Sequence, residues 1–175
     1  MVLMARSDVS IACTRSPASL CVVGELAEGR KQLIFTAFDV LKGRGAALAK
    51  TEIDPIESFV RWDLSPDGHR IAISLSPAGP IRVLALDGRP PLEIRVKGWR
   101  NTRSLRWAAD GNSLLVGDLV QGTAALLLVD LQGNAHALWQ QPGSRGLSGL
   151  PSPDGRSLAI EDWSVNVNMW MMENF

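Results

Sequence analysis

Short runs of alternating apolar and polar residues follow one another along the chain and are separated by turn residues. No segment repeats apolar residues at intervals of three and four over the length of an amphipathic helix. Runs of about four to eight apolar and β-branched residues between turn signals are typical of β-strands. The predicted strands are 9–14, 20–24, 32–38, 46–50, 58–64, 70–75, 81–86, 91–96, 104–107, 113–117, 124–129, 135–139, 147–150, 157–161 and 167–172. The pattern therefore predicts an all-β protein.

One turn signature recurs three times at nearly equal spacing. Its copies are Ser65-Pro66-Asp67-Gly68, Ala108-Ala109-Asp110-Gly111 and Ser152-Pro153-Asp154-Gly155, with aspartates 43 and 44 residues apart. A second series of glycines, at 43, 88 and 133, recurs every 45 residues. This period matches the roughly 40 to 45 residues of a four-stranded propeller blade. We therefore predict an incomplete β-propeller with antiparallel blades at about 8–50, 51–97, 98–142 and 143–175, the last without its outer strand.

The residues of this signature have a mechanical role. Proline presets the backbone for a type I turn, aspartate hydrogen-bonds to its own local backbone, and glycine takes the left-handed conformation. The signature therefore predicts the hairpin between the first two strands of a blade. The alternative, that these aspartates are metal ligands or acids, is disfavoured because three equivalent copies would lie far apart around a ring.

The repeats resemble those of known propellers. The turns that run into Arg-Ile-Ala-Ile at 70–73 and Arg-Ser-Leu-Ala-Ile at 156–160 resemble the WD40-like repeat of TolB-type propellers. Gly-Leu-Pro-Ser-Pro-Asp-Gly at 149–155, leading into Asn-Met-Trp-Met-Met-Glu-Asn-Phe at 168–175, resembles the end of the C-terminal propeller in Acidobacteria-type multidomain regulators. The opening segment 11–21 and Phe-Asp-Val-Leu-Lys-Gly at 38–43 are also similar to their repeats.

In those regulators the propeller follows a serine/threonine protein kinase or a winged-helix DNA-binding domain. The resemblance therefore implies a sensory or protein-interaction role, because this chain shows no kinase motif and no helix-turn-helix pattern. Closed propellers usually have four to eight blades, and about three and three quarters are predicted here. We expect a fragment whose missing part lies upstream of Met1. The alternative is self-association, with two copies closing one ring.

The two cysteines flank a turn. If the first hairpin is centred on Pro17, Cys13 and Cys21 face each other on neighbouring strands, within the span of a disulfide. A shift of one residue in the register would instead leave two small buried thiols. Both interpretations stay open, and a disulfide would favour an extracytoplasmic location.

Charge and composition exclude some classes of partner. The chain has 18 basic and 18 acidic residues, so it lacks the basic excess typical of nucleic-acid binding. The longest apolar run, 124–129, is too short to cross a membrane, and the opening residues do not resemble a signal peptide. The localisation of a longer parent protein stays open.

No constellation typical of an enzyme is present. Only His69 and His136 could serve as a histidine base, and neither is placed over a central pocket. The segment 146–149 misses the nucleophile elbow, and 24–31 departs from the phosphate-loop pattern. The cysteines and histidines have no zinc spacing and no acidic loop suggests calcium, so we expect neither a metal nor a cofactor. We expect a non-enzymatic protein.

Aromatic and charged residues in the loops are the remaining candidates for binding. Trp62 and Trp107 are predicted to be wedges in the core between blades. Two sets of loops on one face, next to the channel, contain the binding candidates Trp99, Arg100, Arg103, Asp118, Gln121, Asp162 and Trp163, with Asn101 and Glu161 beside them. Such residues could recognise a protein, a peptide or a small ligand such as a sugar. An ordinary solvated loop face is the alternative.

These observations favour a sensory or interaction module of a bacterial regulator. Two alternatives remain. The first is the gating propeller of a prolyl-oligopeptidase-type serine peptidase, whose catalytic domain would follow it. The second is a TolB-like periplasmic assembly protein, which requires an export signal.

Overall fold

The computed structural model describes residues 9–14, 19–27, 29, 31–54 and 60–164. These residues form antiparallel β-strands joined by turns and contain no α-helix. The first sheet consists of β1 (Val9–Cys13), β2 (Cys21–Leu26), β3 (Gln32–Asp39) and β4 (Gly43–Glu52), and the second of β5 (Arg61–Leu64), β6 (Arg70–Ser74), β7 (Ile81–Ala85) and β8 (Leu92–Ile94). The third consists of β9 (Thr102–Trp107), β10 (Ser113–Val120), β11 (Thr123–Asp130) and β12 (Ala135–Pro142), and the last of β13 (Leu147–Pro151) and β14 (Leu158–Asp162).

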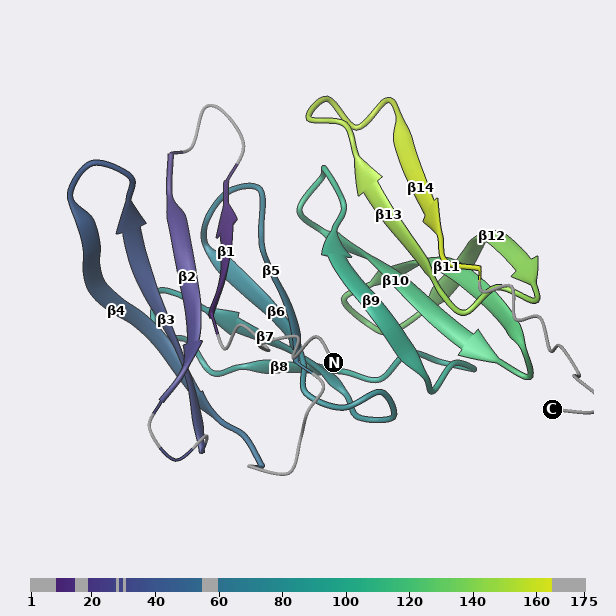
Figure 1. The fold of residues 1–175 in the computed structure, drawn as a ribbon, viewed down its shortest axis with the longest axis horizontal. Coiled ribbons are helices and arrows are strands. Elements are labelled where there is room, and N and C mark those ends of the chain that lie inside the picture. The colour runs from purple at the N-terminus through teal and green to yellow at the C-terminus, as the bar shows by residue number, and fades with distance from the viewer. Residues whose placement is uncertain (1–8, 15–18, 28, 30, 55–59, 165–175) are drawn as a thin grey trace, which may run out of the picture.

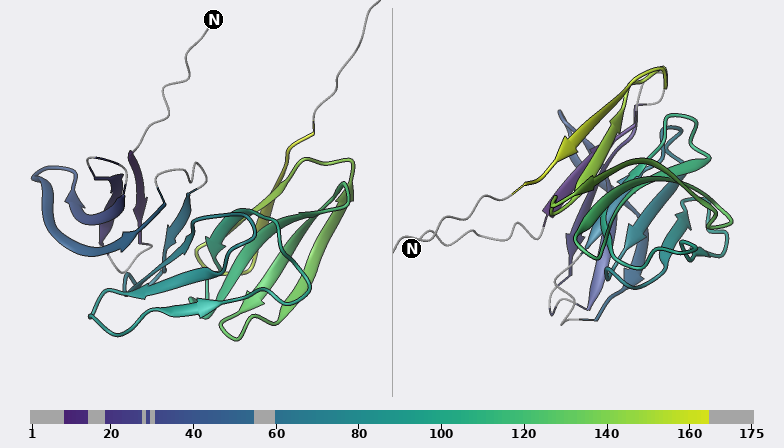
Figure 2. Two further views of the ribbon diagram at one scale, coloured as in Figure 1. Left: turned by 90° about the horizontal axis from the view of Figure 1, so that it is seen from below. Right: turned by 90° about the vertical axis from the view of Figure 1, so that its right-hand side faces the viewer.

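The sheets stand side by side in an arc. In Figure 1 the first strand of each sheet lies on the inner side, while β4 and β12 lie at the outer edges. Figure 2 shows the first and third sheets on either side of the second. Contacts of β5 with β1 and β9, and of β13 with β9, join the inner strands. The predicted fold class is confirmed: this is an incomplete β-propeller of four-stranded antiparallel blades. The predicted strand 167–172 lies outside the described residues.

Several strand ends differ from the prediction. The hairpin strands β10 and β11 run three and one residues further at their shared turn than predicted, because Gln121 and Gly122 alone close it. The outer strand β8 is shorter than predicted and covers only Leu92–Ile94. Pro90 and Pro91 precede it and cannot donate backbone hydrogen bonds to a sheet.

The three repeated turns join the first and second strands of their sheets. In the second sheet, Ser65 Oγ accepts a hydrogen bond from the backbone N–H of Arg70 at 2.9 Å, and Asp67 Oδ1 accepts one from that of His69 at 3.0 Å. Ser152 and Asp154 make the same pair of contacts in the last sheet, and Asp110 accepts from two backbone N–H groups in the third. The turn glycines have φ angles of 66° to 75°, the left-handed region. The signature is therefore used for turns, as its residue types indicate.

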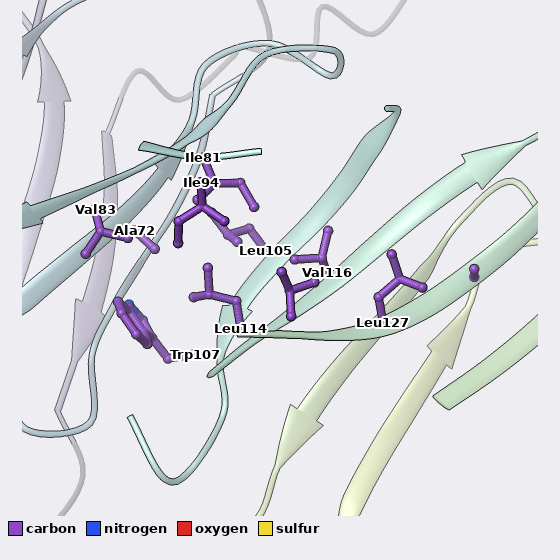
Figure 3. Packing of buried hydrophobic residues seen from close by; sticks show 11 residues of the cluster. Ala72, Ile81, Val83, Ile94, Leu105, Trp107, Leu114, Val116 and Leu127 are labelled. Atoms are coloured by element: carbon purple, nitrogen blue, oxygen red, sulfur yellow. The ribbon is translucent and has the colours of Figure 1, made fainter. Parts of the chain in front are cut away.

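The apolar core lies between sheets. One cluster joins the first and second sheets through Val22, Phe35 and Ile71, among others. A second joins the second and third sheets, and Figure 3 shows Ile81 and Ile94 facing Leu105 within it. A smaller third cluster joins the third and last sheets. Each sheet is thus stabilised mainly by burying a face against its neighbour.

Polar contacts between the second and third sheets add to the apolar core. Asp63 on β5 accepts a hydrogen bond from the backbone N–H of Trp107 at 2.8 Å and lies 3.4 Å from the Arg106 guanidinium. Burial raises the pKa of Asp63, while the Trp107 N–H and the Arg106 charge oppose that rise. The Arg70 guanidinium lies over the Trp107 ring, 4.9 Å from its centroid, and donates to the Gly111 carbonyl at 2.6 Å. Trp107, 2% exposed, is a core residue, as predicted.

Two glycines let neighbouring inner strands approach closely. Gly24 pairs with Ser10 on β1, and Gly117 holds the same position opposite Ser104 on β9. A β-carbon at Gly24 would lie 2.7 Å from the Trp62 indole, and one at Gly117 would collide with the Leu147 carbonyl oxygen. A larger residue at Gly117 would have to displace the backbone of β13, whereas one at Gly24 would have to displace the Trp62 side chain.

The first hairpin carries the disulfide. Cys13 and Cys21 are partners in the register of β1 and β2, and their sulfur atoms are bonded. The predicted centre of the turn, Pro17, lies outside the described residues. The register of β1 and β2 shows that Cys13 and Cys21 face each other.

Candidate functional site

The inner strands of all four sheets line an open cavity of about 310 Å³. Ser10 and Ile11 reach it from β1, Arg61 and Trp62 from β5, Arg103 and Arg106 from β9, Ser148 from β13, Glu161 from β14, and Trp163 from the residue after β14. The cavity therefore lies on the channel side of the arc, where residues from four repeats converge.

Trp62 forms the wall between the first two sheets. Its Nε1 donates a hydrogen bond to Ser10 Oγ at 2.6 Å, and its ring meets Phe35 edge to face with centroids 5.0 Å apart. The indole is half-buried and borders the cavity. Trp62 therefore has two roles: it packs in the core, as predicted, and it presents an aromatic surface to the cavity.

Trp163 forms part of the opposite wall. Its backbone pairs with the segment before β13, because Arg145 N donates to Trp163 O at 2.7 Å and Trp163 N donates to Gly146 O at 3.0 Å. The ring lies against Gly146, where a β-carbon would be 3.2 Å from the indole. Since the side chain is 43% exposed, this indole is both fixed and accessible.

Arg103 occupies an irregular position on β9. Ser104 pairs with Gly117 and Thr102 with Asp118, so Arg103 is an extra residue in the strand. Such a β-bulge redirects a side chain out of the regular alternation. Arg103 borders the cavity and lies beside Gly146 and the Trp163 ring. Its Nε is buried without a hydrogen-bond partner.

Asp118 pairs with Thr102, next to the bulge at Arg103, and is only 1% exposed. Its Oδ2 accepts a hydrogen bond from Asn101 N at 2.9 Å, while its buried Oδ1 has no partner. Burial raises the pKa of Asp118, and the N–H groups of Asn101 and Leu119 and the Arg103 charge oppose that rise. Arg103 and Asp118 thus influence each other without forming an ion pair.

The structure brings together only part of the predicted set. Arg103, Trp163 and Glu161 border the cavity, whereas Asp118 does not border it and is linked to it only through the charge of Arg103. The other candidates do not border it. Trp99 is partly buried against the core of the second and third sheets, Arg100 and Asp162 are exposed, and Gln121 has a φ of 50° in the tight turn between β10 and β11.

Loop-based reasoning missed the residues that the inner strands contribute. Ser10, Arg61, Ser104 and Ser148 border the cavity, and all four hold the same register position. Aligning the repeats on their turns and counting back along each first strand would have found them. The signal was present in the sequence, but it lay in strands and not in loops.

The lining combines three guanidinium groups, one carboxylate, hydroxyls and two indoles. It contains no histidine or cysteine, and within the described residues no three His, Cys, Asp or Glu side chains are grouped to hold a metal ion. Side chains of these types recognise ligands through stacking and hydrogen bonds.

The fold and the cavity define the class of protein: an incomplete β-propeller with a channel-side cavity. No protein-family model matches the sequence, and no curated protein shows a significant match. Among solved structures, TolB from Acinetobacter baumannii is similar, with a TM-score of 0.66 and 18% identity over 91% of this chain and 39% of TolB.

Two further structures share the fold. The β-propeller domain of the Trilobed protease from Pyrococcus furiosus, which has an open velcro topology, matches with a TM-score of 0.52 and 18% identity over 97% of this chain and 58% of that chain. Kuenenia stuttgartiensis hydrazine synthase matches with a TM-score of 0.58 and 16% identity over 87% of this chain and 42% of that chain. The chain thus spans two fifths to three fifths of the structures it matches. In the described residues no helix has the length and apolarity needed to span a bilayer.

Proposed function

We propose that this chain is a non-enzymatic interaction module that binds a protein or peptide partner in the cavity between its inner strands, as the sensory part of a larger bacterial regulator. The observation that carries the proposal is the convergence of Trp62, Trp163 and three arginines from successive repeats. Tryptophan and arginine dominate the energetics of protein interfaces. No nucleic-acid partner is proposed, since acidic and basic residues balance.

Rigid positioning supports the proposal. Trp62 is held by Ser10 and Phe35, and Trp163 is held by backbone hydrogen bonds to Arg145 and Gly146. A partner that meets preorganised aromatic side chains loses less conformational entropy on binding.

An array of extended peptides, read out with the labelled full chain, tests this function. We expect a subset of peptides to bind, and Trp163→Ala to weaken their binding about tenfold or more. Trp139→Ala is the matched control, because Trp139 is similarly exposed, at 51%, on the outer strand β12 and does not border the cavity. If no peptide binds, or if both variants lose binding equally, the proposal is wrong.

A TolB-like periplasmic role is the second candidate, and the Cys13–Cys21 disulfide favours it. Disulfides persist in oxidising compartments and are rare in the cytosol. Sequencing the DNA upstream of the Met1 codon separates the candidates. A kinase or winged-helix domain in frame supports the regulator, whereas a signal peptide directly before the propeller supports the periplasmic protein. The peptidase alternative predicts a hydrolase domain in the same reading frame.

A further inference from the structure

Arg103 and Asp118 are polar at two positions where the fold accepts apolar residues. In the second sheet Val60 precedes Arg61 as Arg103 precedes Ser104, and Leu75 follows Ser74 as Asp118 follows Gly117. Val60 and Leu75 pack against the apolar cluster of the first two sheets. The architecture therefore does not require charge at these positions.

The charged pair also leaves hydrogen-bonding capacity unused. Asp118 Oδ1 and Arg103 Nε are the two buried side-chain atoms without a partner among the described residues. A buried polar group without a partner is costly, so such groups in native proteins commonly serve a function. One atom is an acceptor and the other a donor, and the Trp163 ring lies beside Arg103 across Gly146.

We propose that Arg103 and Asp118 form a two-point recognition site for a primary carboxamide, such as the side chain of Asn or Gln in a bound peptide. The carboxamide oxygen accepts from Arg103, and its NH₂ group donates to Asp118 Oδ1. The Trp163 indole packs on the apolar part of the ligand. The inference rests on the proposed function for the peptide context, but the chemistry is that of the two side chains.

Arg103 can move without losing a hydrogen bond, because no acceptor among the described residues holds its guanidinium. Asp118 is 1% exposed and does not border the cavity, so a ligand reaches its carboxylate only if Arg103 turns aside. A carboxylate ligand would be repelled by Asp118 and has no proton to donate to it. The three guanidinium groups of the lining attract a carboxylate, so the preference for a carboxamide rests on the N–H that only the carboxamide donates to Asp118.

Three small probes of similar shape test this inference: benzamide, benzoate and acetophenone. Titration of the full chain, followed by ligand-observed NMR, should show benzamide binding about fivefold or more tightly than the other two, which lack the N–H donor. The preference should disappear in the Arg103→Val, Asp118→Leu double variant, which installs the residue types of the second sheet. It should persist in Asp87→Leu, Arg89→Val, the same change at an exposed ion pair outside the cavity.

The single variant Arg103→Lys keeps the charge and an N–H donor and leaves Asp118 in place, so it should keep the preference, whereas Asp118→Leu alone should lose it. Equal binding of the three probes to the native chain would overturn the inference, as would a preference that survives in the double variant. The result is separable from the proposed function. Peptides that bind with no preference for Asn or Gln over Asp or Glu refute only the inference, whereas benzamide selectivity with no peptide binding refutes only the peptide function.

Discussion

The second and third sheets are built on the same plan and differ where their first strands begin. The second sheet has Val60 and Leu75 there, both packed against an apolar cluster. The third has Arg103 and Asp118, with a β-bulge at the arginine and two buried polar atoms left unpaired. Val60 and Arg103 both border the cavity, so the two repeats present an apolar and a charged residue to it from equivalent positions. The buried partners differ in the same way, because Leu75 is apolar and Asp118 is a carboxylate.

A carboxylate introduced into the second sheet, at the position equivalent to Asp118 of the third, should have the largest effect on stability. Leu75→Asp would place a carboxylate at a partly buried position against the apolar cluster, and we expect the free energy of unfolding to fall by about 2 kcal/mol. Chemical denaturation measures this change. Leu75→Ala is the control for lost apolar contacts alone, and it should cost clearly less. An equal loss in both variants would show that the position tolerates charge.

Replacing the charged pair of the third sheet by the apolar residues of the second should change the stability little. Arg103→Val combined with Asp118→Leu should leave the free energy of unfolding unchanged or raise it by about 1 kcal/mol, because apolar residues often replace buried charges without loss. Differential scanning calorimetry on the double variant and the native chain tests this expectation. A strong loss of stability would mean that the pair is structural, and would remove the reason to place function there.

The smallest expected effect is on the pH dependence of thermal stability. The pKa of Asp118 is raised above its ordinary value of 3.8, so its ionised form costs stability at neutral pH, and that cost is relieved as pH falls through the raised pKa. We expect Asp118→Asn to raise the melting temperature by roughly 2 to 4 °C at pH 7, a gain that vanishes below about pH 4.

Asp87→Asn is the control with the opposite sign, because the hydrogen bond from Arg89 lowers the pKa of Asp87. The native carboxylate stabilises the fold above its ordinary pKa, and that advantage is lost as the solution is acidified. A gain for Asp118→Asn that does not depend on pH would contradict the role of ionisation.

Most of the fold follows from local sequence signals. Ser65, Asp67 and Gly68 act within one turn, so their roles can be predicted from spacing and residue type. The site is harder to predict, because it depends on contacts between repeats. The bulge at Arg103 comes from the pairing of β9 with β10, and nothing in the local sequence distinguishes the accessible Trp163 from Trp99, which packs against the core.

The disulfide shows the same limit. Sequence reasoning placed Cys13 and Cys21 on facing strands but left two registers open, and the turn between them carries no signal that selects one. The buried face of β2 packs against the second sheet, so the register of this hairpin depends on contacts beyond the hairpin itself.

The missing side chains of Gly24 and Gly117 have a consequence for how neighbouring sheets meet. At Gly117 the carbonyl of Leu147 occupies the space that a β-carbon would need, so the third and last sheets meet backbone to backbone. At Gly24 the Trp62 indole occupies that space, so a side chain of the cavity wall is seated on the first sheet. The same small residue thus makes a seam between sheets in one repeat and a socket for an aromatic ring in another.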